Sequence, residues 1–306
     1  MTSAGIIPLP GLEYSTPSSR EEPVPITATP LSPALGAEIG GADIAAGIDD
    51  ADFAAIESAW HKSALILLRD QHIDEDQQVA FGARFGPLAP WSRFADKVPT
   101  EGGRNPYIML VTNIQENGAY IGTLPEGDIE FHSDGIYVEE PLAATMLHCI
   151  TPTTHGGETA FANMYAAYDA LPAGLKSRID GRKALHAFTY NSTRATDNEQ
   201  RKTNPDDVAR CVHPVVRAHP VTGRKALYVN RLMTQEIVGL PPDESRDILA
   251  ILFDHIETPA FIYEHRWRAG DVLLWDNRCL AHARRDFPPT ETRLMKRLTI
   301  QGTRPF

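Results

Sequence analysis

The stretch EFHSDGIYVEEP, residues 130–141, is predicted to form a strand that carries a histidine and an aspartate two positions apart. Alternate residues of a strand point to the same face, so His132 and Asp134 can approach one ion together. The pair alone is weak evidence for a metal site, because a polar strand face exposed to solvent carries the same kinds of residue. A third ligand, and a reason for a metal, must come from the rest of the chain.

Many short strand candidates surround this stretch, separated by turns rich in Gly, Pro and Asn. Strands of this kind, with a few helices between them, indicate a mainly β fold with flanking helices (α+β), built on a double-sheet barrel or sandwich. Apolar residues at helical spacing, behind a capping aspartate in the first two cases, predict the helices. The predicted helices cover 49–62, 74–86, 164–171 and 243–257, and the clearest other strands cover 64–70, 107–113, 144–150, 158–164, 225–230, 271–276 and 294–302.

The chain has 306 residues and shows no internal repeat or composition shift that would divide it. Residues 1–25 are rich in Pro, Ser and Glu without periodicity, which predicts a mobile or loosely docked tail ahead of a single domain over 26–306. Two long polar stretches, 93–106 and 191–210, are expected to be either surface loops or lids over a site.

The excess of acidic over basic residues limits the kinds of molecule that the protein can bind. There are 29 Lys and Arg against 40 Asp and Glu, a net charge of −11, which argues against nucleic acid or an anionic membrane surface. No apolar run is long enough to span a membrane, and the first residues lack the pattern of a secretory signal. The cysteines are odd in number and widely spaced, which predicts buried apolar side chains in a reducing cytoplasm rather than disulfides. They are Cys149, Cys211 and Cys279.

A third metal ligand is available in DVLLWDNRCLAHARRDF, residues 271–287, where an apolar strand is followed by His282. A lone histidine after a strand is more often structural than a ligand. Together with His132 and Asp134, however, it completes two imidazoles and one carboxylate, the facial triad of non-haem Fe(II) oxygenases. The same three residues could also bind zinc, so the residues around them have to decide.

Two arginines and a threonine help to decide between an Fe(II) site and a zinc site. In TRLMKRLTIQG, residues 292–302, Arg293 and Arg297 share one face of a predicted strand. If that face is interior, the two cations need anions. A co-substrate with a distal carboxylate would fit, since Arg293 can bind it through two hydrogen bonds and Thr159 of HGGETAF can donate another. A surface strand whose arginines pair with Asp or Glu is the alternative.

These motifs, in this order and spacing, resemble the taurine dioxygenase (TauD/TfdA) family of Fe(II)- and 2-oxoglutarate-dependent oxygenases, over about residues 25–306. The resemblance implies a double-stranded β-helix (jelly-roll) core. It also implies that His132, Asp134 and His282 bind Fe(II), and that Thr159 and Arg293 hold the distal carboxylate of 2-oxoglutarate. Dimers or tetramers are the assemblies that the family suggests.

The same resemblance implies a reaction in which 2-oxoglutarate and O2 give succinate and CO2 while a C–H bond of a small organic substrate is oxidised. Halogenating relatives replace the carboxylate ligand by a small residue, so retention of Asp134 favours hydroxylation. Oxidative cleavage after hydroxylation, desaturation and ring formation remain compatible with the same chemistry. Two alternatives are a cupin-like metal enzyme that does not use 2-oxoglutarate and an inactive jelly-roll that binds a ligand. Thr159 and Arg293 argue against the first, and the intact triad argues against the second.

The substrate residues depart from those of the taurine enzyme. Counting along the chain puts Trp91 and Phe94 where that enzyme has a His and a Tyr, and Asp128 where it has an Asn. A substrate bulkier and more apolar or aromatic than taurine is expected, with a carboxylate as the group for Arg297 to bind. Ordinary packing of the two aromatic residues is the alternative. The residues predicted to contact substrate are Trp91, Phe94, Asp128, Tyr137 and Arg297, of which Arg297 faces substrate, 2-oxoglutarate or both.

Overall fold

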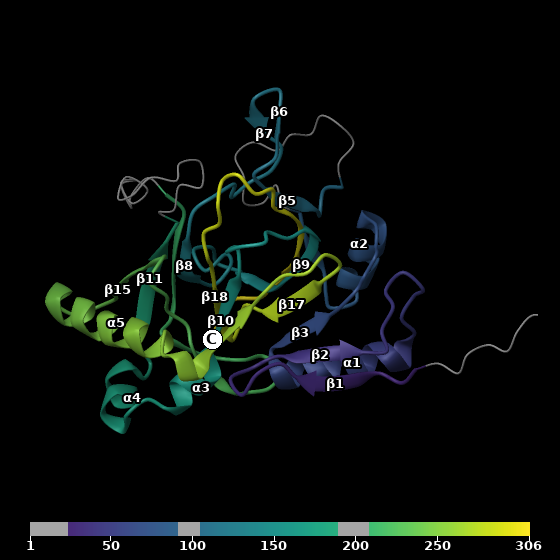
Figure 1. Ribbon diagram of the computed structural model, residues 1–306. Helices are drawn as coiled ribbons and strands as arrows, with labels where there is room; N and C mark the ends of the chain where they lie inside the picture. Colours follow the sequence, from purple (N-terminus) through teal and green to yellow (C-terminus); the bar gives the residue numbers. More distant parts are fainter. Residues whose placement is uncertain (1–23, 91–104, 189–207) are drawn as a thin grey trace, which may run out of the picture.

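A computed structural model of the chain describes residues 24–90, 105–188 and 208–306 (Figure 1). Most of the predicted tail over 1–25 and most of the segments 93–106 and 191–210 lie outside these residues, so the expectations for them stay predictions. Within the described part of the chain, no helix is long and apolar enough to cross a membrane.

The larger of two main sheets has eight strands. Its path runs β1-β2-β3-β17-β9-β19-β4, and β5 also pairs with β19. All neighbours are antiparallel except β2 and β3. The strands are β1 (Thr27–Pro30), β2 (Ala37–Gly40), β3 (Leu65–Leu68), β4 (Leu88–Ala89), β5 (Met109–Thr112), β9 (Leu142–Thr151), β17 (Val272–Asp276) and β19 (Leu294–Gln301).

The second main sheet has four strands in the order β16-β10-β18-β8, all antiparallel. They are β8 (Ile129–His132), β10 (Thr159–Asn163), β16 (Ile262–His265) and β18 (Leu280–Arg284). Three small sheets complete the strands: β12 (Arg210–Pro214), β11 (Lys183–Ala187) and β15 (Thr234–Ile237); β13 (Val216–Ala218) and β14 (Lys225–Leu227); and β6 (Gln115–Glu116) and β7 (Ala119–Tyr120).

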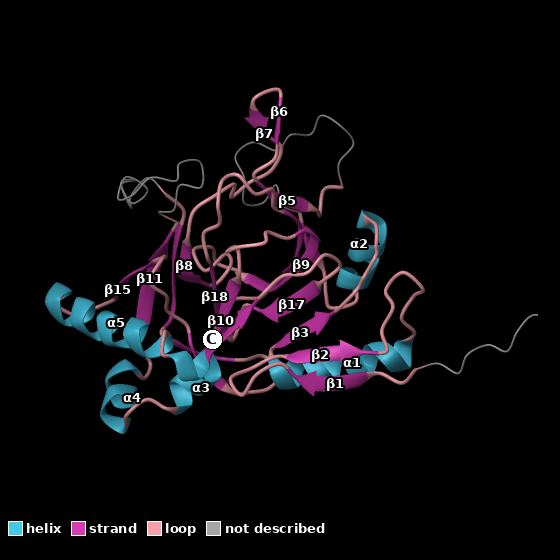
Figure 2. Ribbon diagram, viewed as in Figure 1, coloured by secondary structure: helices cyan, strands magenta, loops and turns pink. Residues whose placement is uncertain are grey.

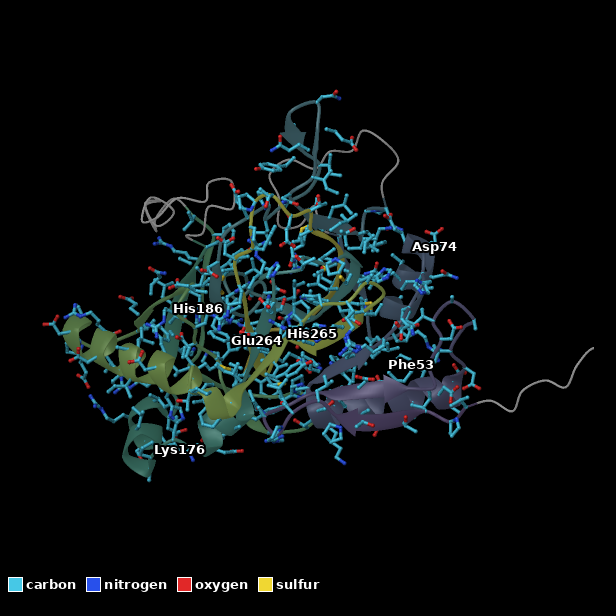
Figure 3. The ribbon with its side chains drawn as sticks, viewed as in Figure 1. Phe53, Asp74, Lys176, His186, Glu264 and His265 are labelled. Carbon is cyan, nitrogen blue, oxygen red and sulfur yellow. The ribbon has the colours of Figure 1, made fainter. Side chains whose placement is uncertain are left out.

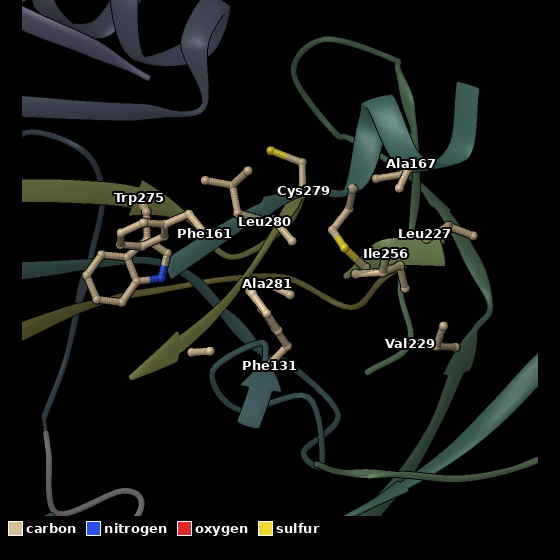
Figure 4. Close-up of a cluster of buried hydrophobic side chains, with 14 of the residues drawn as sticks. Phe131, Phe161, Ala167, Leu227, Val229, Ile256, Trp275, Cys279, Leu280 and Ala281 are labelled. Atoms are coloured by element: carbon tan, nitrogen blue, oxygen red, sulfur yellow. The ribbon is translucent and has the colours of Figure 1, made fainter. Parts of the chain in front are cut away.

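The central strands of the large sheet are buried on both faces. In β3, Leu65 and Leu67 belong to the core shared with the second sheet, whereas Ile66 and Leu68 belong to a separate core on the other face. This alternation explains why the sequence of β3 is apolar at every position, as expected for a strand covered on both sides. Trp275 of β17 meets Phe161 of β10 edge to face at 5.3 Å, which joins the two sheets (Figure 4).

Helices cover the outside of this framework (Figure 2). Asp74 caps α2 in a capping box with Gln77, as the sequence pattern predicts, and its side chain lies at the start of that helix in Figure 3. The four predicted helices are present, and α4 is additional; it begins without a side-chain cap, so the sequence gives no start signal for it. The helices are α1 (Asp50–Ser63), α2 (Glu75–Ala83), α3 (Met164–Asp169), α4 (Ala173–Ile179), α5 (Pro242–Ile256) and a 3₁₀ turn, η4 (Pro259–Phe261).

One local prediction is wrong. The stretch 130–141 is not a strand through Asp134, because β8 ends at His132. Ser133 donates its hydroxyl to the backbone oxygen of Leu280, at 3.1 Å, and Gly135 follows with a positive φ of 72°. A left-handed glycine turns the chain immediately after the aspartate. His132 and Asp134 therefore approach each other across the end of a strand rather than along one of its faces.

Candidate active site

A cavity of about 440 Å³ is lined by residues of both main sheets and of the segments that connect them. It brings together most of the residues that the sequence predicts for the site: His132, Asp134, His282, Thr159, Arg293, Arg297 and Tyr137. Asp128 is not among the lining residues. It is exposed, and its carboxylate accepts a hydrogen bond from the backbone N–H of Asp286 at 2.7 Å. Trp91 and Phe94 lie outside the residues that the structure describes.

The three predicted metal ligands converge at one point of the cavity. The end of β8 pairs with the middle of β18 so that His282 lies opposite His132, and their ring centres are 4.1 Å apart. His132 Nε2 lies 3.8 Å from Asp134 Oδ1, and His282 Nε2 lies 3.9 Å from Asp134 Oδ2. One ligand atom from each residue lies within 4.8 Å of the other two, a spacing compatible with a shared metal ion.

The imidazoles are in a form suited to metal binding. His132 Nδ1 lies 2.9 Å from the backbone oxygen of Glu130, so this nitrogen carries the proton and Nε2 is left as a free donor of electrons. Burial lowers the pKa of His132, and burial together with the neighbouring His132 lowers the pKa of His282 to about 3. Both rings are therefore neutral at ordinary pH, which is the state that a metal requires.

The carboxylate of Asp134 is held at its second oxygen. Asp134 Oδ2 accepts a hydrogen bond from the hydroxyl of Thr145 at 2.6 Å, and Arg297 Nη2 lies 2.8 Å from the same oxygen. Burial alone would raise the pKa of Asp134, but the Arg297 guanidinium and the hydrogen bond from Thr145 hold it well below its usual range. The residue is therefore an anion, and two imidazoles with one carboxylate are donors that fit Fe(II).

Arg293 and Thr159 form a second polar region of the cavity. Arg293 is 2% exposed, and its Nε has no hydrogen-bond partner among the described residues. Burial, with Arg284 nearby, lowers the pKa of Arg293 to about 9. An unsatisfied buried guanidinium is costly, so this region is suited to an anion such as a carboxylate.

Two further residues shape this region. The indole of Trp267 donates a hydrogen bond to Thr159 Oγ1 at 3.0 Å, which leaves the hydroxyl proton of Thr159 free for another acceptor. Gly157 has a φ of 71°, and a Cβ built there would lie 2.7 Å from Thr153 Oγ1 and 3.4 Å from Arg293 Nε. Gly157 is therefore needed both for its backbone conformation and for the close approach of Thr153, beside Arg293.

Arg284, the third arginine of the cavity, has a structural role. Its guanidinium donates to the backbone oxygens of Leu124, Glu126 and Gly127 at 2.6 to 3.2 Å. These bonds fix the segment that precedes β8.

The rest of the cavity wall is largely apolar. Tyr137 and Phe188 pack against each other with ring centres 4.7 Å apart, and burial raises the pKa of Tyr137 to about 12, so its hydroxyl stays protonated. Apolar side chains of connecting segments and of β5 contribute to this wall. They are Met109, Leu124, Phe188, Leu232 and Met233.

A second group of potential ligands, His219, Asp276 and Cys279, is already satisfied by the protein. Arg278 binds both oxygens of Asp276, at 2.8 and 2.6 Å, and His219 Nε2 lies 2.9 Å from Oδ2. The guanidinium neutralises the carboxylate, so this group is a structural network. The aspartate and the arginine of the WDNR motif, Asp276 and Arg278, therefore have a structural role in this network, and no catalytic role is needed to account for them.

The sequence does not reveal three residues of the site. Thr145 and Trp267 contact predicted site residues, and Asn277 donates from Nδ2 to Thr145 Oγ1 at 2.9 Å. Asn277 belongs to the quoted WDNR motif, but it meets Thr145 only through the pairing of β9 with β17. No local pattern connects residues so far apart in the chain.

The chain was compared with known proteins. It matches the family described as "Taurine catabolism dioxygenase TauD, TfdA family" over residues 27–299. It is 33% identical over 279 residues to the (S)-phenoxypropionate/alpha-ketoglutarate-dioxygenase of Sphingobium herbicidovorans, covering 89% of this chain and 94% of that protein. It is 30% identical over 284 residues to the alpha-ketoglutarate-dependent 2,4-dichlorophenoxyacetate dioxygenase of Cupriavidus pinatubonensis, covering 90% and 97%.

Among solved structures, AAD-2 in complex with Mn(II) and N-oxalylglycine superposes with a TM-score of 0.72 at 28% identity, covering 92% of this chain and 99% of that one. A taurine dioxygenase from Burkholderia xenovorans gives a TM-score of 0.73 at 29% identity, covering 92% of both chains.

Proposed function

Because this chain belongs to the TauD/TfdA family and is therefore an Fe(II)- and 2-oxoglutarate-dependent dioxygenase, we propose that His132, Asp134 and His282 bind its iron. The single observation that carries this assignment is the convergence of their three ligand atoms within 4.8 Å, with both imidazoles held neutral. When bound, the iron supplies the oxidising chemistry that consumes O2 and 2-oxoglutarate and gives succinate and CO2. Three protein ligands leave the remaining coordination positions to the co-substrates.

Arg293 and Thr159 bind the distal carboxylate of 2-oxoglutarate in this proposal. The unpartnered Nε of Arg293 and the proton of Thr159, freed by the bond from Trp267, supply the hydrogen bonds. A carboxylate at this point also provides the counter-charge that the buried guanidinium lacks.

The substrate is proposed to be a small organic anion with an aromatic or other bulky apolar body. Its carboxylate faces Arg297, whose Nη2 lies 2.8 Å from Asp134 Oδ2. A divalent ion would take over much of the charge compensation of Asp134, so that Arg297 becomes available to a substrate anion. Tyr137 and Phe188 then pack against the apolar body. The relatives named for phenoxypropionate and 2,4-dichlorophenoxyacetate agree with this kind of substrate.

Hydroxylation is the proposed outcome. Where the oxidised carbon also bears an O-, N- or S-linked group, the hydroxylated product is expected to break down with cleavage of that bond. Asp128 is left out of the proposed substrate contacts because it is exposed and bonded to the backbone of Asp286. The two main sheets are proposed to form the jelly-roll core of a single domain over 26–306. A cytoplasmic location and a homodimer or homotetramer complete the proposal.

An anaerobic titration tests the metal and co-substrate sites together. The metal-free protein is titrated with Fe(II) and then with 2-oxoglutarate, and the visible charge-transfer band of the chelate is recorded. The band is expected in the wild type and in His255→Ala, whose imidazole contacts the backbone oxygen of Ala167 away from the cavity. It is expected to be absent in His132→Ala and His282→Ala. A normal band in either of these variants would contradict the assigned ligands.

Substrate class is tested with matched compounds. Succinate formation is measured with phenoxyacetate, with the neutral phenoxyethanol and with taurine. Phenoxyacetate is expected to stimulate turnover more than either of the others, because it alone combines the carboxylate with the aromatic body. Equal stimulation by phenoxyethanol would remove the carboxylate from the proposal, and a preference for taurine would remove the aromatic body.

A further inference from the structure

A chain of hydrogen bonds ends on the carboxylate of Asp134. The indole Nε1 of Trp275 donates to Asn277 Oδ1 at 2.9 Å, and Asn277 Nδ2 donates to Thr145 Oγ1 at 2.9 Å. Thr145 Oγ1 in turn lies 2.6 Å from Asp134 Oδ2. Asn277 and Trp275 are each 1% exposed and Thr145 is fully buried, so bulk water does not compete for these bonds.

The chemistry of the groups fixes the direction of every bond in this chain. An indole N–H can only donate, so the atom of Asn277 that faces Trp275 is its oxygen, and its NH₂ group must face Thr145. A hydroxyl has a single proton. Because Thr145 accepts from Asn277, its proton points to Asp134.

We propose that Thr145 is a positioning residue for the metal centre, which fixes the orientation of the Asp134 carboxylate by its hydrogen bond to Oδ2. This inference rests on the proposed metal site. Asp134 Oδ1 lies 3.8 Å from His132 Nε2, and Oδ2, to which Thr145 and Arg297 bond, lies 3.9 Å from His282 Nε2, so a rotation of the carboxylate would change its distance to both imidazoles. A carboxylate fixed in this way would keep one orientation toward the metal, which is the usual role of a hydrogen-bond partner of a metal ligand.

Arg297 contacts the same oxygen but is less suited to fix it. Its side chain is long, it is partly exposed, and an anion in the cavity competes for it. Thr145 lies in the middle of β9, where it pairs with Trp275 of β17 on one side and with Thr299 of β19 on the other. Its hydroxyl is therefore held by the two neighbouring strands whatever the cavity contains.

The test compares Thr145→Val, Thr145→Ser and Ser245→Ala. Valine keeps the shape of threonine and removes the hydroxyl, whereas serine keeps the hydroxyl. Ser245 serves as a matched control, because it is buried in α5 and its hydroxyl accepts the backbone N–H of Ile237, away from the cavity. For each metal-free variant, Fe(II) affinity is measured anaerobically by equilibrium dialysis, and stability by urea unfolding.

Thr145→Val is expected to bind Fe(II) about 10- to 100-fold more weakly, the usual effect of removing a residue that orients a metal ligand. Thr145→Ser should restore wild-type affinity within a few-fold, and Ser245→Ala should lose stability at unchanged affinity. If Thr145→Val does not fold, Thr145→Ala removes the same hydroxyl without crowding Asp134, and it should also bind weakly.

Wild-type Fe(II) affinity in the variants that lack the hydroxyl would overturn the inference, as would an equal loss of affinity in Ser245→Ala. His282→Ala is measured alongside. If it retains Fe(II), the proposed metal site itself fails, whereas loss of Fe(II) in His282→Ala alone rejects only the role of Thr145.

Discussion

The burial of Arg293 indicates the kind of ligand that the cavity binds. Its guanidinium is buried, and the Nε has no protein partner among the described residues, although the fold could have placed a carboxylate beside it. A protein keeps such a cation when a ligand completes it. At this scale the sequence pattern and the structure agree: Arg293, two positions after Glu291 and four before Arg297, opens into the same cavity as Thr159.

Arg293→Ala is expected to raise the 2-oxoglutarate concentration for half-saturation by roughly 10- to 100-fold, the range for losing hydrogen bonds to a charged group. Fe(II) affinity should change little. The measurement is the anaerobic chelate titration at varied 2-oxoglutarate. Arg285→Ala is the control, since it removes the same charge from an exposed residue that pairs with Glu264. An unaltered 2-oxoglutarate requirement would take Arg293 out of this role.

Trp267→Phe is expected to have a smaller effect on the same titration. It removes the indole donor to Thr159 and keeps an aromatic ring against His265, whose ring centre lies 4.6 Å away. Loss of one neutral hydrogen bond, about 1 kcal/mol, corresponds to roughly a fivefold rise in half-saturating 2-oxoglutarate. Thr159→Val should raise it further. If the two variants leave 2-oxoglutarate binding as it was, the contact is structural only.

At the scale of elements, local patterns predicted four of the helices and the long central strands β9, β17 and β19, because caps and alternation are properties of neighbouring residues. The capping residue Asp74 predicts the start of α2, and the apolar run of β3 predicts a strand that is covered on both faces. The prediction failed where contacts between distant segments decide. Ser133, which follows the end of β8, bonds to the distant backbone of Leu280, and Thr145 meets Asn277 only across paired strands.

The turn that precedes β10 provides a test at this scale. Gly157→Ala places a Cβ against Thr153 and Arg293 in addition to straining a backbone with φ of 71°. Gly181 is a matched control, because its φ is 66° and nothing lies within 4 Å of its added Cβ. Both variants should lose about 1–2 kcal/mol of stability to the strained backbone.

Only Gly157→Ala should also weaken 2-oxoglutarate binding, because only there does the new methyl group force a neighbour, Thr153, to shift beside Arg293. Urea unfolding and the chelate titration measure the two effects separately. Equal 2-oxoglutarate affinity in the two variants would show that the motif glycine serves the turn alone.

The molecule as a whole buries several imidazoles in their neutral form. Burial lowers the pKa of His186 to about 3, and it also lowers the pKa of His148 and of His213. The unfolded chain binds protons to these groups near pH 6.5, and the folded protein does not. Their contribution to stability is therefore complete above about pH 6.5 and is lost as the pH falls toward the folded values.

We accordingly expect the free energy of unfolding of the metal-free protein to fall between pH 7 and pH 5, by at most about 1.4 kcal/mol per pH unit for each such group. Urea unfolding at several pH values measures this slope. His186→Asn should flatten it, whereas His72→Asn, at an exposed position, should not. A slope that is the same in His186→Asn as in the wild type would contradict a neutral buried His186.

Two kinds of segment line the cavity: strands carry several of the polar site residues, and connections between strands carry apolar side chains. His132, Thr159, His282 and Arg297 lie on strands, where their positions depend on pairing across whole sheets. Leu124, Phe188 and Leu232, which shape the space for the substrate, lie in connections between strands. Connections accept substitution more readily than paired strands. A lineage can therefore acquire a new substrate by changing a few connecting residues while inheriting its oxidation chemistry intact, and an engineer could exchange the same segments without rebuilding the metal centre.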